Sequence, residues 1–221
     1  FVAEGVTEHL SDAWEFVLAV EREDHSEQAV ELRSFHALTE KEDVFLEGTG
    51  SIVLDREAGV AYCALSPRAD EDLFIEFCED FEYNPVIFTA NQTVNGKREA
   101  IYHTNVMMCL GETFAVICSD CIDDKKERKN VLKQLQDSGK EVIRITETQV
   151  LNFAGNMLQV KGKDDKRFLI MSQAAYDCLS AAQIKIIEKH CDILSSSLDT
   201  IEACGGGSAR CMMAEVFLPR A

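Results

Sequence analysis

The sequence predicts an α+β protein built as a circular or stacked array of similar units, each a strand, a strand, a helix and a strand. Two observations carry this prediction. A loop of small or polar residues feeds an apolar strand four times, in GTGSIVLD, HTNVMMCL, FAGNMLQV and GGSARCMMAEV. The aligned positions Ile52, Val106, Met157 and Cys211 also lie about 50 residues apart, a period typical of repeat architectures in which each unit buries its face against its neighbours.

The first two units show the complete pattern. After GTGSIVLD come the strand VAYCAL, a helix expected at 69–81 and a strand expected at 85–89. After HTNVMMCL come the strand FAVICS and a helix expected at 123–138, which stops at Gly139 because glycine readily ends helices. A strand at 141–146 would close this second unit, and turns are expected at 91–96 and 161–165.

The third and fourth units are predicted in the same way. The third has a second strand at 168–171, a turn at 173–179, a helix at 180–190 and a strand at 198–203. The apolar run at 212–218 is expected to be a buried strand, which would place Cys211 at the lip of a rigid element. At the N-terminus, apolar residues at helical spacing predict an amphipathic helix at 6–20. We therefore divide the chain into an N-terminal segment, 1–43, that is a partial or divergent first unit, and the array at 44–221.

Composition restricts the partners. The formal net charge of −17 repels phosphate backbones and anionic lipid surfaces, so we expect neither nucleic acid nor membrane binding. Nine cysteines without regular spacing predict free thiols in a reduced, cytoplasmic setting. Cys118 and Cys121 form a lone CxxC without a second ligand pair, so no metal is expected, and no motif indicates a cofactor.

The loops that open the units are expected to converge at one end of the array. They would bring together Glu47, His103, Asn105, Asn156 and Cys211. A thiolate adds to an electrophilic carbon, a histidine moves protons, and a carboxylate orients the histidine or holds substrate N–H groups. Each residue taken alone has a structural alternative: Cys211 as a buried cysteine after a flexible turn, His103 as a satisfied core histidine, Glu47 as a partner of backbone amides.

The segments FLEGTGSIVLD, IYHTNVMMCLG, NFAGNMLQV and TIEACGGGSARCMMAEVFLP together resemble the guanidino-group-modifying superfamily, the pentein or β/α-propeller enzymes. Within it they look most like the citrulline hydrolase (citrulline ureidase) branch, which is related to amidinotransferases. The resemblance implies Cys211 as nucleophile, His103 as general acid and base, and Glu47 as acidic partner. It also implies five ββαβ units, of which four are recognisable here.

The resemblance implies a small amino-acid substrate of arginine metabolism. Where arginine deiminases place an Asp to hold a cationic guanidinium, this chain has Asn105, and an amide both donates and accepts, which suits a neutral urea. We therefore expect hydrolysis of citrulline to ornithine, carbon dioxide and ammonia, with Asn105, Asn156, Gly206 and Arg210 binding substrate. Arg68 and Arg210 are candidates for the α-carboxylate.

Three alternatives stay open. An arginine or guanidine deiminase, or an amidinotransferase, would use the same thiol on a guanidinium. A non-catalytic pentein would be an interaction protein instead. An incomplete ring leaves strand edges that a partner or a second copy would cover, so a homo-oligomer is also expected.

Overall fold

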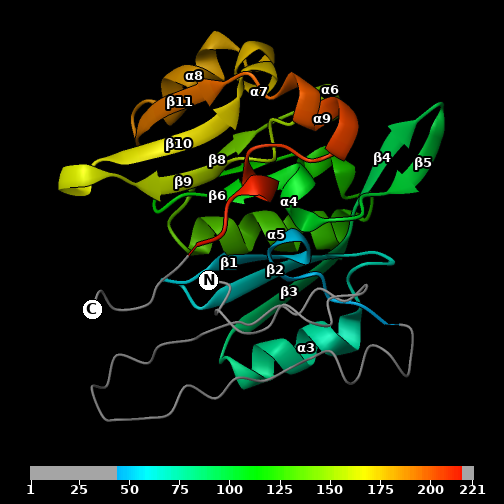
Figure 1. Cartoon of the computed structure of the whole chain (residues 1–221). Helices are drawn as coiled ribbons and strands as arrows, with labels where there is room; N and C mark the ends of the chain where they lie inside the picture. Colours follow the sequence, from blue (N-terminus) through cyan, green and yellow to red (C-terminus); the bar gives the residue numbers. More distant parts are fainter. Residues whose placement is uncertain (1–43, 216–221) are drawn as a thin grey trace, which may run out of the picture. The chain divides into compact units, whose positions relative to one another are not determined.

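Three three-stranded sheets of one topology form the framework of the described part of the chain (Figure 1). The computed structural model describes residues 44–215, so the helix predicted at 6–20 lies outside the described residues. The sheet orders are β1-β2-β3, β6-β7-β8 and β9-β10-β11. In each sheet the first two strands are antiparallel and the last two are parallel, with a helix in the parallel connection. The predicted α+β fold of ββαβ units is confirmed.

The first unit begins with a helical turn and contains one long helix. Its elements are α2 (Gly48–Ser51), β1 (Ile52–Asp55), β2 (Val60–Leu65), α3 (Glu71–Asp80) and β3 (Asn84–Thr89). Helix α3 starts where the side chain of Asp70 accepts a hydrogen bond from the Leu73 amide, a standard N-cap. Its apolar face, including Phe74 and Phe77, is buried. This unit matches the prediction to within a few residues.

The second unit repeats this order. Its elements are α4 (Thr104–Met107), β6 (Met108–Leu110), β7 (Phe114–Ile117), the 3₁₀ turn η1 (Ser119–Cys121), α5 (Lys125–Asp137) and β8 (Glu141–Arg144). Asp124 caps α5 by accepting from the Lys126 and Glu127 amides. The chain leaves this helix at Gly139, whose φ of 75° is unfavourable for residues with a Cβ. The predicted helix stop is therefore correct.

The third unit contains two short helices between its parallel strands. Its elements are α6 (Glu147–Val150), β9 (Leu158–Lys161), η2 (Lys163–Asp165), β10 (Arg167–Ser172), α7 (Gln173–Cys178), α8 (Ala181–Ile187) and β11 (Asp192–Ser196). A reciprocal capping box between Ser180 and Gln183 starts α8. The strand predicted at 198–203 is wrong: β11 closes the sheet earlier, and α9 (Asp199–Gly205) occupies that position. Acidic residues Asp199 and Glu202 in its first turn favour a helix there.

The final predicted strand is also corrected. Arg210–Met212 form the 3₁₀ turn η3, and 213–215 have no regular structure. Cys211 is exposed and lies in this turn, not at the lip of a buried strand. Its amide donates to the side chain of Asn156, far away in the sequence, a contact that the apolar pattern of the following residues does not reveal. Residues 216–218 of the predicted strand lie outside the described residues, and the division at residue 43 stays a prediction.

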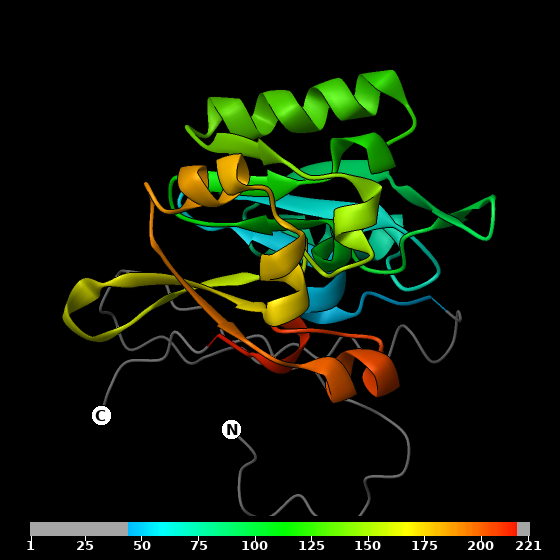
Figure 2. The ribbon, with the colours of Figure 1, turned by 90° about the horizontal axis from the view of Figure 1, so that it is seen from above.

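A hairpin that the sequence indicated only as a turn is inserted between the first two units. Its strands are β4 (Asn91–Val94) and β5 (Lys97–Ala100), and Asn95 and Gly96 both have positive φ, as two-residue hairpin turns require. It projects from the sheets (Figure 2). Arg98 fixes it by ion pairs to Asp123 (2.6 Å) and Glu147 (2.5 Å).

The first strands of the units lie next to one another, β1 against β6 and β6 against β9. Their opening turns therefore meet at one end, as predicted. Behind them runs a continuous apolar core that includes the fully buried Phe88, Phe114 and Met157. All nine cysteines are free thiols. Within residues 44–215, every helix is too short or too polar to cross a lipid bilayer.

Candidate functional site

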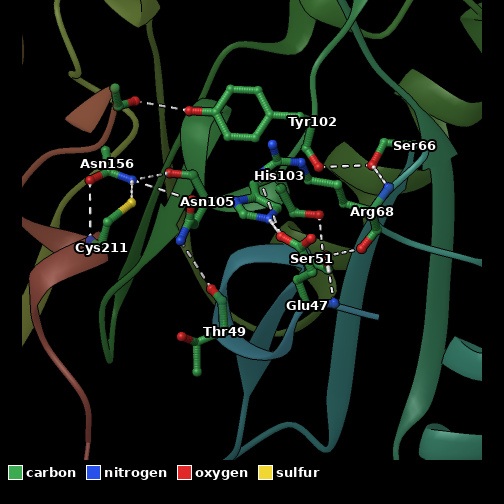
Figure 3. A network of polar contacts seen from close by, with 12 residues as sticks. Glu47, Thr49, Ser51, Ser66, Arg68, Tyr102, His103, Asn105, Asn156 and Cys211 are labelled. Carbon is green, nitrogen blue, oxygen red and sulfur yellow. Dashed lines mark hydrogen bonds and ion pairs between the residues drawn. The ribbon is translucent and has the colours of Figure 1, made fainter. Parts of the chain in front are cut away.

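The opening turns of the three units and the turn η3 bring the predicted residues together (Figure 3). Glu47 precedes α2, His103 precedes α4, Asn156 precedes β9, and Cys211 lies in η3. Asn105 lies within α4, between the Glu47–His103 pair and the Asn156–Cys211 pair. The predicted loops before β1, before β6 and at Cys211 are short helical segments, α2, α4 and η3, whereas Asn156 lies in a non-helical turn.

Glu47 and His103 are joined by a short hydrogen bond, with 2.6 Å between His103 Nε2 and Glu47 Oε2. An ionised carboxylate only accepts hydrogen bonds, so we assign the proton to Nε2, which leaves Nδ1 as an acceptor. Burial lowers the pKa of His103 below its usual value of 6.5, although Glu47 opposes this by favouring the charged ring. His103 is therefore suited to act as a neutral base near pH 7.

A buried hydroxyl network holds this pair. The Ser51 hydroxyl accepts from the Glu47 amide (3.2 Å) and donates to the Arg68 carbonyl (2.6 Å). The Thr104 hydroxyl accepts from the Ala64 amide (2.8 Å) and donates to the Ser51 carbonyl (2.5 Å). Both side chains are fully buried. Thr104 joins α4 to β2 and to the last residue of α2, and Ser51 joins α2 to the Arg68 carbonyl, with little competition from water.

Gly50 allows the close packing of the histidine. A Cβ at this position would lie 2.8 Å from His103 Nδ1 and Cε1, well inside van der Waals contact. The glycine in the segment EGTG is therefore needed for the position of the ring, and any side chain here would displace it. The sequence indicated small residues beside a ligand, and the structure shows that Gly50 makes room for the His103 ring.

Asn156 connects the thiol to the rest of the site. Its Nδ2 donates to Cys211 Sγ (3.2 Å) and to the Asn105 carbonyl (3.1 Å), and its Oδ1 accepts from the Arg210 amide (3.1 Å). The donor directed at the sulfur stabilises negative charge there. Asn156 was predicted to bind substrate, but in this structure its amide positions the turn η3 and the thiol.

The amide of Asn105 is also engaged within the protein. It is 3% exposed, its Nδ2 donates to the Thr49 carbonyl (3.1 Å), and its Oδ1 lies 3.3 Å from Asn156 Nδ2. The side chain thus ties α2 to Asn156.

Tyr102 is a site residue that the sequence reasoning missed. Its hydroxyl donates to the Gly206 carbonyl (3.0 Å), its ring packs on His103 with 4.9 Å between centroids, and the Arg68 guanidinium lies 5.2 Å from its ring centroid. Burial raises the pKa of Tyr102, and negative charge on Cys211 adds to this shift. Its place directly before His103 was the one signal that could have identified it.

With this geometry in view, the comparisons with known proteins decide the family. The model of a family described as N,N dimethylarginine dimethylhydrolase, eukaryotic, matches residues 15–218, nearly the whole chain. This chain belongs to that family. The resemblance to the guanidino-group-modifying superfamily is thereby confirmed, and the choice of the citrulline hydrolase branch within it stays a prediction. No curated protein sequence matches the chain.

Solved structures support the fold of this dimethylarginine dimethylhydrolase family member. Apo ArgZ, an arginine dihydrolase from the ornithine-ammonia cycle in Cyanobacteria, aligns with a TM-score of 0.60 at 18% identity, over 77% of this chain and 23% of that one. AgrE in complex with ornithine and NAD+ aligns with a TM-score of 0.62 at 19% identity, over 81% and 24%. The N-terminal domain of ArgZ bound to product gives 0.59 at 20% identity, over 77% and 56%. The chain thus spans about a quarter of the longer proteins.

Two further predicted residues lie at the edge of the site of this family member. The Arg210 guanidinium donates to the Met213 carbonyl (2.9 Å) and pairs with Glu215 (3.2 Å), so it is engaged locally. Gly206 has a φ of 67°, and its carbonyl receives the Tyr102 hydroxyl. A Cβ at Gly207 would lie 3.0 Å from the Cys211 Cβ, so the glycine at this position makes room for Cys211.

The CxxC pair lies away from this site in the family member described here. Cys118 and Cys121 are fully buried in and next to η1. Interaction with Cys121 lowers the pKa of Cys118, and the same interaction raises that of Cys121. Among residues 44–215, no group of three or more His, Cys, Asp or Glu side chains is arranged to hold a metal ion.

Proposed function

We propose that this chain is a cysteine-dependent hydrolase that breaks a C–N bond at the guanidino or ureido carbon of an amino acid. The observation that supports this most strongly is the pair of arrangements in Figure 3: a thiol with an amide donor on its sulfur, and a carboxylate-paired histidine on the other side of Asn105. Nucleophile, proton carrier and orienting acid are the three parts that covalent catalysis of this kind needs.

In the proposed mechanism His103 Nδ1 takes the Cys211 proton as the sulfur attacks the substrate carbon. The C–N bond then breaks, and the departing amine takes that proton from His103, leaving the acyl or amidino group on sulfur. Water attacks this adduct while His103 takes one of its protons, and the C–S bond breaks to restore the thiol. Glu47 stabilises the charged histidine during both transfers through the 2.6 Å contact.

The charge of the site supports a neutral ureido substrate, citrulline. Glu47 is the one carboxylate among the residues labelled in Figure 3, and it is already shared between His103 and Arg68, whose Nη1 lies 3.5 Å from Oε2. A cationic guanidinium would therefore meet little uncompensated negative charge there. Binding a cation without a matching anion is costly, whereas a urea needs only hydrogen bonds. The products would be ornithine, carbon dioxide and ammonia.

The family supports a second candidate, a methylated arginine. Its description names a dimethylarginine dimethylhydrolase, and the same steps with dimethylamine as leaving group would yield citrulline and dimethylamine. Dimethylamine leaves from the guanidino carbon itself, so the thiol and histidine roles do not change. With unmethylated arginine as substrate, the chain would be a deiminase. ArgZ and AgrE give this alternative little support, because they are only structural neighbours that act on or bind related amino acids.

Arg68 is the better of the two arginines for the substrate α-carboxylate. Its side chain is 52% exposed and stacks on Tyr102 beside Glu47, whereas Arg210 is occupied by Glu215. The planar guanidinium can pair with a carboxylate in two parallel hydrogen bonds. The cytoplasmic location and the homo-oligomer predicted from the sequence belong to this proposal as well.

The decisive experiment offers the chain citrulline, asymmetric dimethylarginine and arginine in parallel, with Cys211→Ala as the comparison. We expect ornithine and ammonia from citrulline, or citrulline and dimethylamine from dimethylarginine, with both reactions lost in the variant. Intact-mass measurement after a rapid acid quench should show an adduct on Cys211. The absence of turnover and of adduct with all three substrates would favour the alternative, an interaction protein of this fold.

A further inference from the structure

A hollow of about 390 Å³ on the outer side of helix α5 is lined mainly by cations. Five basic side chains surround it: Lys125, Arg128, Lys129 and Lys133 from α5, and Arg144 from the neighbouring strand β8. No acidic residue takes part in the lining. We call this surface the α5–β8 basic groove. Figure 2 shows α5, in green at the top of the view, on the outer edge of the described residues.

The groove is unusual for a chain of this composition. Asp and Glu outnumber Lys and Arg by 39 to 22, so a surface with five neighbouring cations and no lining anion does not follow from average composition. Arg128 and Lys133 have partial compensation from Asp120 and Asp137. In the part of the chain that the structure describes, Lys125, Lys129 and Arg144 have no carboxylate partner. Their charges are available to a ligand.

The geometry of the groove is elongated. Lys125, Lys129 and Lys133 follow one another at i, i+4 and i+8, so they form a row along the helix of about 12 Å at 1.5 Å per residue. Leu132, which is half-buried, gives the groove an apolar floor. A row of this length matches about four residues of extended peptide at roughly 3.3 Å each.

We propose that the α5–β8 basic groove binds a short acidic segment of a partner protein, with one apolar side chain of that segment on Leu132. The ligand should be acidic because the groove is lined by five basic side chains. It should be a peptide and not a bare phosphate chain, because only a peptide can place an apolar side chain on Leu132. A long nucleic acid would extend beyond the groove onto a surface whose overall charge is −17, which repels it. A short segment stays within the row of about 12 Å, which is close to the Debye length of about 10 Å at 0.1 M salt, so the more distant negative charges are largely screened from it.

Fluorescence anisotropy of the complete chain with a labelled peptide of Asp and Glu around a central Leu tests this. The triple variant Lys125→Gln, Lys129→Gln, Arg144→Gln should weaken binding about tenfold or more, because each exposed pair contributes modestly and three are lost. The control variant Lys97→Gln, Lys163→Gln, Lys185→Gln removes three exposed cations elsewhere, changes the net charge equally and should leave affinity within about twofold. Circular dichroism checks that both variants fold alike.

Two further arms separate this ligand from others. A peptide with Ser in place of the central Leu should bind more weakly, and binding should fade as ionic strength rises from about 0.01 M to about 1 M. Equal loss in the two triple variants, or no binding by the wild-type chain, would overturn the proposal. So would tight binding of inorganic polyphosphate at the groove without binding of the peptide, since that result would identify a general polyanion site.

Discussion

The two halves of the candidate site are held in different ways. His103 and Glu47 precede helical turns that the buried hydroxyls of Ser51 and Thr104 tie to one another, to strand β2 and to the Arg68 carbonyl. Cys211 is exposed in a 3₁₀ turn, and its sulfur is held by one amide, that of Asn156. The half that holds His103 and Glu47 is therefore set by the core of the fold, whereas the half that holds Cys211 depends on a few hydrogen bonds at its edge. Substitutions in the two halves should differ in what they damage.

The largest expected effect is the loss of activity when the thiol of Cys211 is removed. Cys211→Ala should reduce turnover by about 10⁴-fold or more, because no other group can form the covalent adduct. The Cys204→Ala variant is a matched control, since Cys204 is the other exposed cysteine and lies in α9. It should retain activity in the same product-release assay. Loss of activity in Cys204→Ala, with Cys211→Ala still active, would show that Cys204 and not Cys211 is the nucleophile.

The buried half should show its importance in stability. Thr104→Val keeps the size of the side chain but leaves the Ala64 amide and the Ser51 carbonyl without their partner. Such a loss lowers the free energy of unfolding by about 1–3 kcal/mol. Urea unfolding followed by circular dichroism measures it. Thr104→Ser keeps the hydroxyl and should lose less, so equal losses in both variants would show that packing and not hydrogen bonding matters there.

The exposed half should show its importance in thiol reactivity instead. Asn156→Asp keeps the acceptor for the Arg210 amide but replaces the donor on Cys211 Sγ with a charged oxygen. A hydrogen bond to a charged group contributes about 1.5–3 kcal/mol, so alkylation of Cys211 by iodoacetamide should slow about tenfold or more. Peptide mass spectrometry can follow Cys211 and Cys204 separately. An unchanged rate at Cys211 would mean that Asn156 does not support the thiolate.

The smallest effect concerns pH and belongs to the buried half. The pKa of His103 lies below its usual 6.5, mainly through burial, so its NMR titration midpoint should fall below that value. The unfolded chain then binds a proton more readily than the folded one. The contribution of His103 to the free energy of unfolding is therefore lost as pH falls from about 6.5 toward the folded pKa, and it is constant above this window. Glu47→Gln removes a group that raises this pKa, so the titration midpoint of His103 should be lower still in this variant. A rise would contradict the contact between Glu47 and His103.

Most of the fold could be predicted because short segments of sequence are enough to identify the strands and helices of each repeat. Apolar strands, capped helices and Gly139 identify three complete units. The errors occur where local signals compete. The apolar run after Cys211 resembled a strand, but the Asn156 side chain organises the turn from a position more than 50 residues away. The segment after β11 has strand-like residues, yet its acidic first turn starts a helix.

The identity of the site could be predicted better than its contacts. Glu47, His103 and Cys211 were found because repeat positions place them at one end of the array. The sequence does not show which partner each amide chooses: Asn105 and Asn156 bond to one another and to the backbone, and their binding of substrate stays a prediction. Tyr102 was missed because its partner, Gly206, lies far along the chain.

The long reach of these contacts has a consequence for the order of folding. Each sheet is closed within its own segment of chain, but the site contacts join residues 51, 55, 56 and 104 positions apart. Contacts between distant residues require longer loops to close, which costs entropy and slows their formation. During refolding, strands and helices should therefore regain their circular dichroism signal before iodoacetamide reactivity at Cys211 reaches its native value. We therefore expect the arrangement of the candidate site to form late in folding, so that its recovery measures the assembly of separate units.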